Sequence, residues 1–131
     1  MSASRVTVPR MMKQVIVLFM GLLSFFGLRA ADYRSVDVNE FAQVIREADV
    51  CLLDVRTEKE FAEGHIEGSI CIDVTRADFM EKAAALLPKD KTIALYCRSG
   101  RRSKKAAELL SDAGYKVVEL NTGYLGWVNA Q

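Results

Sequence analysis

Short runs that are apolar at nearly every position alternate with amphipathic segments along most of the chain, and this alternation restricts the fold more than any other feature. The runs cover residues 50–55, 69–74, 92–96 and 116–120. Continuous apolar character over such lengths is typical of strands that are buried on both faces of a parallel sheet. We therefore predict a parallel sheet that contains these four segments.

The segments between these runs carry helical spacing. Apolar residues recur at the i, i+3, i+4 and i+7 positions over 41–48, and further apolar stripes cover 79–87 and 106–113. Thr57 and Glu60 form a capping-box pattern, which predicts a short helix that ends at the next glycine. Strands that alternate with helices in this way predict a small three-layer α/β domain.

The first thirty residues stand apart from this pattern. Residues 15–28 form a stretch of 14 residues that is apolar apart from Ser24 and two glycines, and it follows Lys13. A basic flank, a short apolar stretch and alanines behind it are typical of a signal peptide, whereas a membrane span needs roughly 20 apolar residues. We predict a signal peptide over 1–30 and a domain over 31–131 that is exported to the periplasm or secreted.

Two features of this segment leave alternatives open. Leu28 stands where a small residue is preferred before a cleavage site, so an uncleaved N-terminal anchor is the alternative to a cleaved signal peptide. Met11 or Met12 is a more usual start for a signal peptide than Met1, in which case the first ten residues are a mis-assigned extension.

The charge balance changes once residues 1–30 are set aside. They carry four basic residues and no acidic one, so the remainder has 14 basic and 17 acidic residues, a net charge of −3. This balance gives no support for binding to nucleic acid or to an anionic membrane. The basic cluster at 98–105 is therefore a local feature of a slightly acidic domain.

The cysteines indicate reactive or buried thiols and not a metal centre. Cys51, Cys71 and Cys97 include no CxxC pair, and His65 is the one histidine of the chain, so we expect no metal site. An odd number of cysteines in an exported protein implies at least one free thiol. Cys51 and Cys71 lie in apolar runs and are interpreted as buried free cysteines, with a disulfide between them as the alternative.

Cys97 differs from the other two because it ends a strand and precedes a basic, glycine-containing turn. The predicted strand 92–96 leads directly to it, and we expect the next helix to open at Ser103. Ligands of parallel sheets bind at the carboxyl ends of the strands, where backbone N–H groups of a helix start converge. Gly100 lets the turn curl tightly, and the helix dipole adds positive charge. The sequence therefore predicts a Cys97 thiol of lowered pKa that acts as a nucleophile beneath an anion-binding loop.

A general base is harder to find. We interpret His65, the one candidate, as a structural residue of the turn between a helix and a strand. A reaction in which a good anion leaves does not need a base, and both sulfur transfer and phosphoryl transfer meet this condition.

Five short motifs in order along the chain resemble those of single-domain rhodaneses. They are Asp54-Val55-Arg56, Glu60-Phe61, Gly64-His65-Ile66-Glu67-Gly68-Ser69, Cys97-Arg98-Ser99-Gly100-Arg101-Arg102-Ser103 and Gly123-Tyr124-Leu125-Gly126-Trp127. Each motif alone is weak, but five in the right order are a strong signal, and the resemblance covers roughly residues 33–129. The resemblance implies a parallel five-stranded sheet flanked by helices, with 33–36 as the additional strand.

The resemblance also implies a chemistry. Cys97 would take a sulfane sulfur from a small anionic donor such as thiosulfate or polysulfide, hold it as a persulfide without any cofactor, and pass it to cyanide or a thiol. The chain has no resolving CxxC pair, so discharge must come from outside, for example from a thiol or a thioredoxin-like protein. We expect the domain to be a monomer.

The resemblance implies different roles for the residues around Cys97. The loop from Arg98 through Ser99, Gly100 and Arg101 to Arg102 would bind the substrate, mainly through its amides. The side chain of Arg102 is expected to brace the loop through a carboxylate. Asp54, Arg56 and Ser103 are expected to support the loop from behind. Gly123, Gly126 and Trp127 are expected to pack a terminal turn beside it.

Loop length separates two reactions on this scaffold. Phosphatases and arsenate reductases of the same fold place five residues between the cysteine and the arginine, but here four residues separate Cys97 from Arg102. A shorter loop fits a single sulfur and a longer one a tetrahedral oxyanion, so the spacing favours sulfur transfer. A phosphatase or arsenate reductase is one alternative, and a non-catalytic persulfide carrier or protein-binding module is the other.

Overall fold

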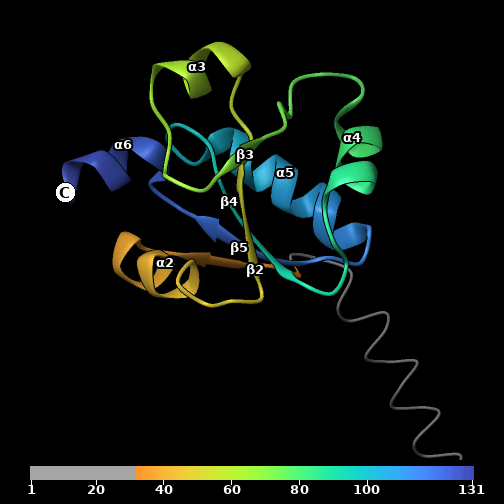
Figure 1. Cartoon of the computed structure of the whole chain (residues 1–131), viewed down its shortest axis with the longest axis horizontal. Helices are drawn as coiled ribbons and strands as arrows, with labels where there is room; N and C mark the ends of the chain where they lie inside the picture. The colour runs from red at the N-terminus through yellow and green to blue at the C-terminus, as the bar shows by residue number, and fades with distance from the viewer. Residues whose placement is uncertain (1–31) are drawn as a thin grey trace, which may run out of the picture. The chain divides into compact units, whose positions relative to one another are not determined.

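The computed structural model describes residues 32–131, whose chain builds a parallel five-stranded sheet with helices on both faces (Figure 1). The predicted signal peptide lies outside the described residues. The strands are β1 (Arg34–Val36), β2 (Val50–Asp54), β3 (Ile70–Cys71), β4 (Thr92–Tyr96) and β5 (Lys116–Leu120), in the spatial order β1-β5-β4-β2-β3. The helices are α2 (Val38–Val44), α3 (Glu58–Glu63), α4 (Phe79–Leu86), α5 (Arg101–Asp112) and α6 (Gly123–Asn129). The predicted α/β class and the five parallel strands are confirmed.

The register of the sheet brings the ends of two strands together. β4 lies at the centre and pairs with β2 and β5, and Asp54 at the end of β2 is the direct partner of Tyr96 at the end of β4. Because both strands run in the same direction, the residues that follow Asp54 and Tyr96 leave the sheet at the same edge. The residues around Arg56 and the Cys97 loop are therefore neighbours although they are far apart in the sequence.

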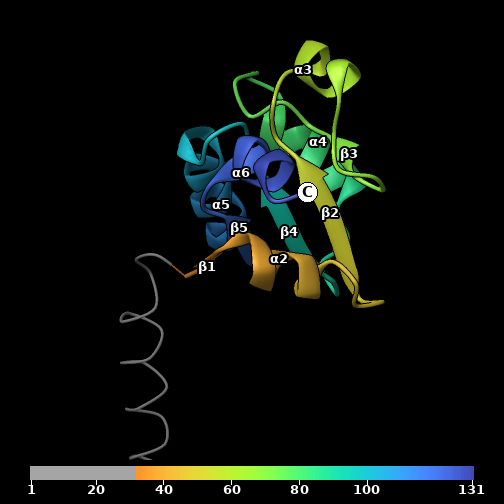
Figure 2. The same ribbon diagram turned by 90° about the vertical axis from the view of Figure 1, so that its left-hand side faces the viewer.

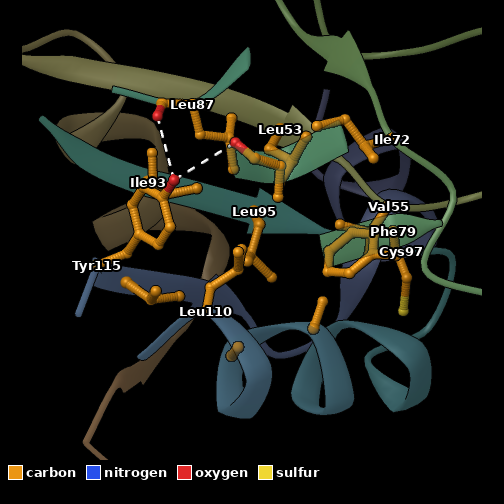
Figure 3. Close-up of a cluster of buried hydrophobic side chains, with 14 residues drawn as sticks. Leu53, Val55, Ile72, Phe79, Leu87, Ile93, Leu95, Cys97, Leu110 and Tyr115 are labelled. Atoms are coloured by element: carbon orange, nitrogen blue, oxygen red, sulfur yellow. Dashed lines mark hydrogen bonds between the residues drawn. The ribbon is translucent and has the colours of Figure 1, made fainter. Parts of the chain in front are cut away.

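Two apolar layers cover the faces of the sheet. One cluster joins the sheet to α4 and α5 through residues such as Phe79, Ala107 and Leu110, and the other joins it to α2 and α6 through Phe41 and Trp127. Figures 1 and 2 show α2 on the opposite face of the sheet from α5. Figure 3 shows Cys97 at one end of the first cluster, beside Val55 and Phe79.

Three element boundaries differ from the prediction. The helix after Cys97 begins at Arg101 and not at Ser103, because Gly100 adopts a left-handed φ of 100° and completes the turn early. β3 comprises two residues of the predicted 69–74, since it lies at the sheet edge and pairs with β2 alone. The terminal turn that begins at Gly123 is the start of a seven-residue helix.

The two remaining cysteines are free thiols. Cys51 and Cys71 are partly buried and not fully buried as expected, because β2 and β3 lie toward one edge of the sheet. The Cys71 sulfhydryl donates a hydrogen bond of 3.5 Å to the Arg56 carbonyl. Within residues 32–131, no helix is long and apolar enough to cross a membrane.

Candidate active site

Cys97 occupies the end of the central strand, directly beneath the start of α5. Its side chain is 1% exposed. The Gly100 N–H donates a hydrogen bond of 3.1 Å to the Cys97 sulfur, and the Ser103 hydroxyl oxygen lies 3.4 Å from that sulfur. The strand, the turn and the first helical turn thus converge on one sulfur atom, which is the geometry of an activated nucleophile.

The environment of this sulfur favours the thiolate. Burial opposes ionisation, but the hydrogen-bond contact with the Ser103 side chain and the hydrogen bonds from the backbone amides of Ser103, Gly100 and Ser99 outweigh it. The pKa of Cys97 is therefore lower than that of an ordinary cysteine. The opposite holds for Cys71, where burial and the nearby carboxylates, Asp54 first among them, raise the pKa to about 11. Of these two thiols, only Cys97 is prepared for nucleophilic attack.

Backbone contacts from α6 hold the loop over Cys97. The Tyr124 N–H donates to the Cys97 carbonyl at 2.8 Å, and the Leu125 N–H donates to the Arg98 carbonyl at 3.0 Å. This approach requires glycine at position 123, because a Cβ there would lie 2.4 Å from the carbonyl carbon and oxygen of Arg98. The glycine of the last motif thus fixes the position of the loop that surrounds Cys97.

Arg102 pairs with a carboxylate on α3. Its two terminal nitrogens lie 2.7 and 2.9 Å from the two oxygens of Glu60, a bidentate pair that joins the first turn of α5 to α3. The Arg102 hydrogen bonds lower the pKa of Glu60 to about 2. The Glu60 side chain also accepts from the Thr57 backbone, so the predicted capping box is present and shares its carboxylate with the loop.

Asp54 and Arg56 form a buried ion pair beside this loop. The Arg56 guanidinium lies 2.7 Å from a carboxylate oxygen of Asp54 and donates to the Gly64 carbonyl at 2.6 Å. It also stacks 4.4 Å from the centre of the Tyr124 ring. Through these contacts, Arg56 connects β2, the segment after α3 and the start of α6. Asp54 already neutralises its charge.

A pocket of about 330 Å³ opens at this edge of the sheet. It carries two acidic and two basic side chains beside an aromatic ring and is lined by Arg56, Glu60, Glu63, Gly64, Arg98, Tyr124 and Leu125. Arg98 directly follows Cys97 in the sequence and brings one positive charge to the pocket. Arg101 is exposed and lines no part of it.

His65 takes no part in this constellation. Its ring stacks on Phe61 with centroids 3.7 Å apart, and its Nδ1 lies 2.8 Å from the Phe61 carbonyl oxygen. Among the hydrogen bonds of residues 32–131, none joins His65 to Cys97. The ring packs the turn after α3, in agreement with a structural role.

The structure brings Cys97, Gly100 and Ser103 together and adds a carboxylate that the sequence reasoning missed. Glu119 of β5 is completely buried, and its Oε2 accepts a hydrogen bond from the Ser103 hydroxyl. A signal for it was present, because Glu119 is a single charged residue inside the otherwise apolar run 117–120. Of the other predicted site residues, Ser99 has an exposed side chain, and its backbone N–H is directed toward the Cys97 sulfur.

Comparisons with known proteins agree with this geometry. The profile of the rhodanese-like domain matches residues 37–130. Thiosulfate sulfurtransferase 18 of Arabidopsis thaliana is 35% identical over 113 residues, which cover 77% of this chain and 82% of the relative. Thiosulfate sulfurtransferase PspE of Escherichia coli is 38% identical over 74 residues, which cover 56% of this chain and 68% of the relative.

A solved structure shares the architecture. The rhodanese-related protein of Thermoplasma volcanium superposes with a TM-score of 0.65 at 32% identity. The superposition covers 75% of this chain and 93% of that protein.

Proposed function

This chain belongs to the rhodanese family, and from that premise we propose that it is a sulfurtransferase that carries a sulfane sulfur as a persulfide on Cys97. The observation that carries the proposal is the Cys97 sulfur itself, which accepts a hydrogen bond from the Gly100 N–H at the start of α5. The two relatives named thiosulfate sulfurtransferases support transfer of sulfur as the reaction class and thiosulfate as the first donor to test.

The proposed reaction has two steps. The Cys97 thiolate attacks the outer sulfur of thiosulfate, a bond forms between the two sulfurs, and the bond to the sulfonate sulfur breaks so that sulfite leaves with the electron pair. A thiophilic acceptor such as cyanide or a thiolate then attacks the outer sulfur of the persulfide, and Cys97 is released as a thiolate. Each step is a displacement at sulfur with an anionic leaving group, so it requires neither a cofactor nor a general base.

The residues divide this work between them. The amides of the loop stabilise the negative charge on the sulfur, because they lie at a helix start and point toward Cys97. Arg98 attracts the anionic donor from the pocket. The Arg102–Glu60 pair and the buried Asp54–Arg56 pair keep the loop in place.

Two further aspects belong to the proposal. We propose that the domain is exported, on the basis of the apolar stretch 15–28, and that its acceptor is an external thiol or thioredoxin-like protein. A persulfide carrier without turnover is the second candidate, favoured by the near-complete burial of Cys97.

The test is the intact mass of residues 31–131 after treatment with thiosulfate. We expect a gain of one sulfur atom that cyanide removes as thiocyanate, and we expect Cys97→Ser to gain none. Cys71→Ser is the matched control and should load like the wild type, because its thiol has a raised pKa. Loading without catalytic release to cyanide or thiols would favour the carrier. Absence of loading from any sulfane donor, together with hydrolysis of an aryl phosphate, would favour the phosphatase.

A further inference from the structure

A buried carboxylate and the nucleophile face opposite sides of one hydroxyl group. The Ser103 oxygen lies 3.4 Å from the Cys97 sulfur, and the same hydroxyl donates to the Glu119 carboxylate. Glu119 is 0% exposed and Cys97 is 1% exposed, so neither anion can be compensated by bulk water at this point. The two acids are therefore coupled through a single serine.

The number of protons available limits which hydrogen bonds Cys97, Ser103 and Glu119 can form at the same time. A serine hydroxyl has one proton, and an ionised carboxylate only accepts hydrogen bonds. When Ser103 donates to ionised Glu119, its proton cannot also stabilise a Cys97 thiolate. Cys97 must then keep its own proton and donate it to the Ser103 oxygen.

A second arrangement satisfies the same three groups. If the Cys97 proton moves to Ser103 while the Ser103 proton moves to Glu119, the serine then donates to the thiolate and the protonated carboxyl donates to the serine. No charge is created, since one proton leaves sulfur and one arrives at the carboxylate. The two arrangements differ in the direction of two hydrogen bonds and in the position of the negative charge, which moves from Glu119 to Cys97.

We propose that Cys97 and Glu119 share one proton through the Ser103 hydroxyl, so that Glu119 receives the thiol proton when the nucleophile forms. Glu119 acts on the sulfur through Ser103 and is a positioning residue for the reaction. This inference rests on the proposed role of Cys97 as the nucleophile.

Two exposed polar side chains also contact the Glu119 carboxylate. Ser35 is the direct cross-strand partner of Glu119, is exposed, and donates to its other oxygen at 2.5 Å. The Lys104 ammonium lies 3.4 Å from both carboxylate oxygens and is 47% exposed on its side chain. Tyr33 is also titratable, and burial, followed by the charges of Glu119 and Glu108, raises its pKa. The Ser35 hydroxyl therefore joins the Glu119 carboxylate to the exposed edge strand β1.

The decisive measurement is the pH dependence of Cys97 alkylation by iodoacetamide, followed by mass spectrometry of the Cys97 peptide. Two acids that share a proton titrate as a pair with two macroscopic steps. We expect two rises in the wild-type rate: one as the pair loses its first proton, and one as it loses the second. Glu119→Gln should show one rise, with a limiting slope of about tenfold per pH unit.

Glu108→Gln is the matched control, because it makes the same chemical change on α5 and also acts on Tyr33, while its side chain lies outside the Cys97–Ser103–Glu119 chain. It should keep both steps. A one-step wild-type profile that superposes on that of Glu119→Gln overturns the proposal. Since the wild-type profile alone must show two steps, the proposal stays falsifiable even if Glu119→Gln does not fold.

A spectroscopic readout distinguishes proton sharing from a purely structural role. Between the two steps, infrared difference spectra of the wild type should contain the carbonyl stretch of a protonated carboxyl group. This band should vanish in Glu119→Gln and also in Cys97→Ser, whose hydroxyl retains its proton. A band that persists unchanged in Cys97→Ser means that the proton on Glu119 does not come from Cys97, and the proposal fails.

Ser103→Ala offers a second variant, because it removes the shared hydroxyl while Glu119 keeps Ser35 and Lys104. We expect a one-step alkylation profile, and two retained steps would contradict the inference. These readouts do not involve sulfur transfer. If thiosulfate fails to load Cys97 while the two steps are present, the proposed function fails and the shared proton stands. If thiosulfate loads Cys97 while the wild-type profile has one step, the shared proton fails and the proposed function stands.

Discussion

Gly123→Ala is predicted to displace the active-site loop by direct backbone contact. Gly123 has a φ of +65°, and a Cβ at this position would lie 2.4 Å from the carbonyl carbon and oxygen of Arg98 and 2.6 Å from the Ser99 nitrogen. All three atoms belong to the backbone, so no side-chain rotation can relieve the contact. The loop that surrounds Cys97 must move away from α6, or α6 must move away from the loop.

The size of the effect follows from these distances. Opening the contact from 2.4 Å to 3.0 Å, the shortest separation that Cβ atoms normally show, requires a shift of about 0.6 Å. A misplacement of about 1 Å near reacting groups can lower rates on the order of a hundredfold, so we expect a loss of roughly tenfold in sulfur uptake. A left-handed conformation at a non-glycine residue adds a cost of about 1–2 kcal/mol in stability.

Gly114→Ala separates these two effects. Gly114 also has a positive φ, +95°, but its added Cβ would meet only the Lys89 ammonium at 3.6 Å, at the far end of α5. It therefore introduces comparable backbone strain without contact with the loop.

The assay combines urea unfolding with the rate of sulfur uptake from thiosulfate, measured by intact mass. We expect Gly114→Ala to lose about 1–2 kcal/mol of stability because it places a side chain at positive φ, and Gly123→Ala to lose at least as much because it adds the backbone contact. Only Gly123→Ala should lose activity. A folded Gly123→Ala with the wild-type rate, or an equal loss of rate in Gly114→Ala, would refute the view that close packing of α6 positions the loop.

Two further predictions concern acid stability and export. The pKa of Glu60 is about 2 in the folded chain against an ordinary 4.5, so the Arg102–Glu60 pair stabilises the fold above pH 4.5 and loses this contribution as the pH falls toward 2. Glu60→Gln should therefore lower the unfolding free energy by about 1 kcal/mol at neutral pH, and the difference should disappear in acid denaturation. N-terminal sequencing of protein from the native host should find a chain that starts near Ala31, and an intact Met1 or Met12 in a cytoplasmic fraction would contradict export.

Much of the fold could be predicted from the sequence, because strands that are buried on both faces consist mainly of apolar residues. The bounds of β4 and β5 match the apolar runs 92–96 and 116–120, since both strands are covered on both faces. The predicted start of α5 is two residues late, because Gly100 adopts a left-handed conformation against the Asn121 carbonyl, which lies in the distant turn between β5 and α6.

The residues of the site likewise fall into two groups: those close to Cys97 in the sequence and those that packing brings to it. Cys97, Gly100 and Ser103 lie within seven residues, so a strand, a turn and a helix start were enough to associate them. Glu60 and Glu119 reach the loop only through the packing of α3 and the register of β5. Sequence spacing does not predict such contacts. A single charged residue inside an apolar strand does, however, indicate a buried side chain that needs a hydrogen-bonding partner.

The charge balance of the site gives a second reason, besides loop length, to prefer sulfur over a tetrahedral oxyanion. A phosphate dianion needs positive side chains whose charge is available, but Arg102 is held by both oxygens of Glu60 and Arg56 by Asp54. Within residues 32–131, Arg98 is the one basic residue of the pocket that forms no ion pair. The Glu60 and Glu63 carboxylates on the pocket wall further oppose a dianion that stays bound at the loop. Thiosulfate is itself a dianion, so the charge balance separates the two reactions at the covalent intermediate on Cys97 and not at the entering substrate. A persulfide carries one negative charge, and the amides at the start of α5 together with one free guanidinium match that charge without any rearrangement of the existing pairs.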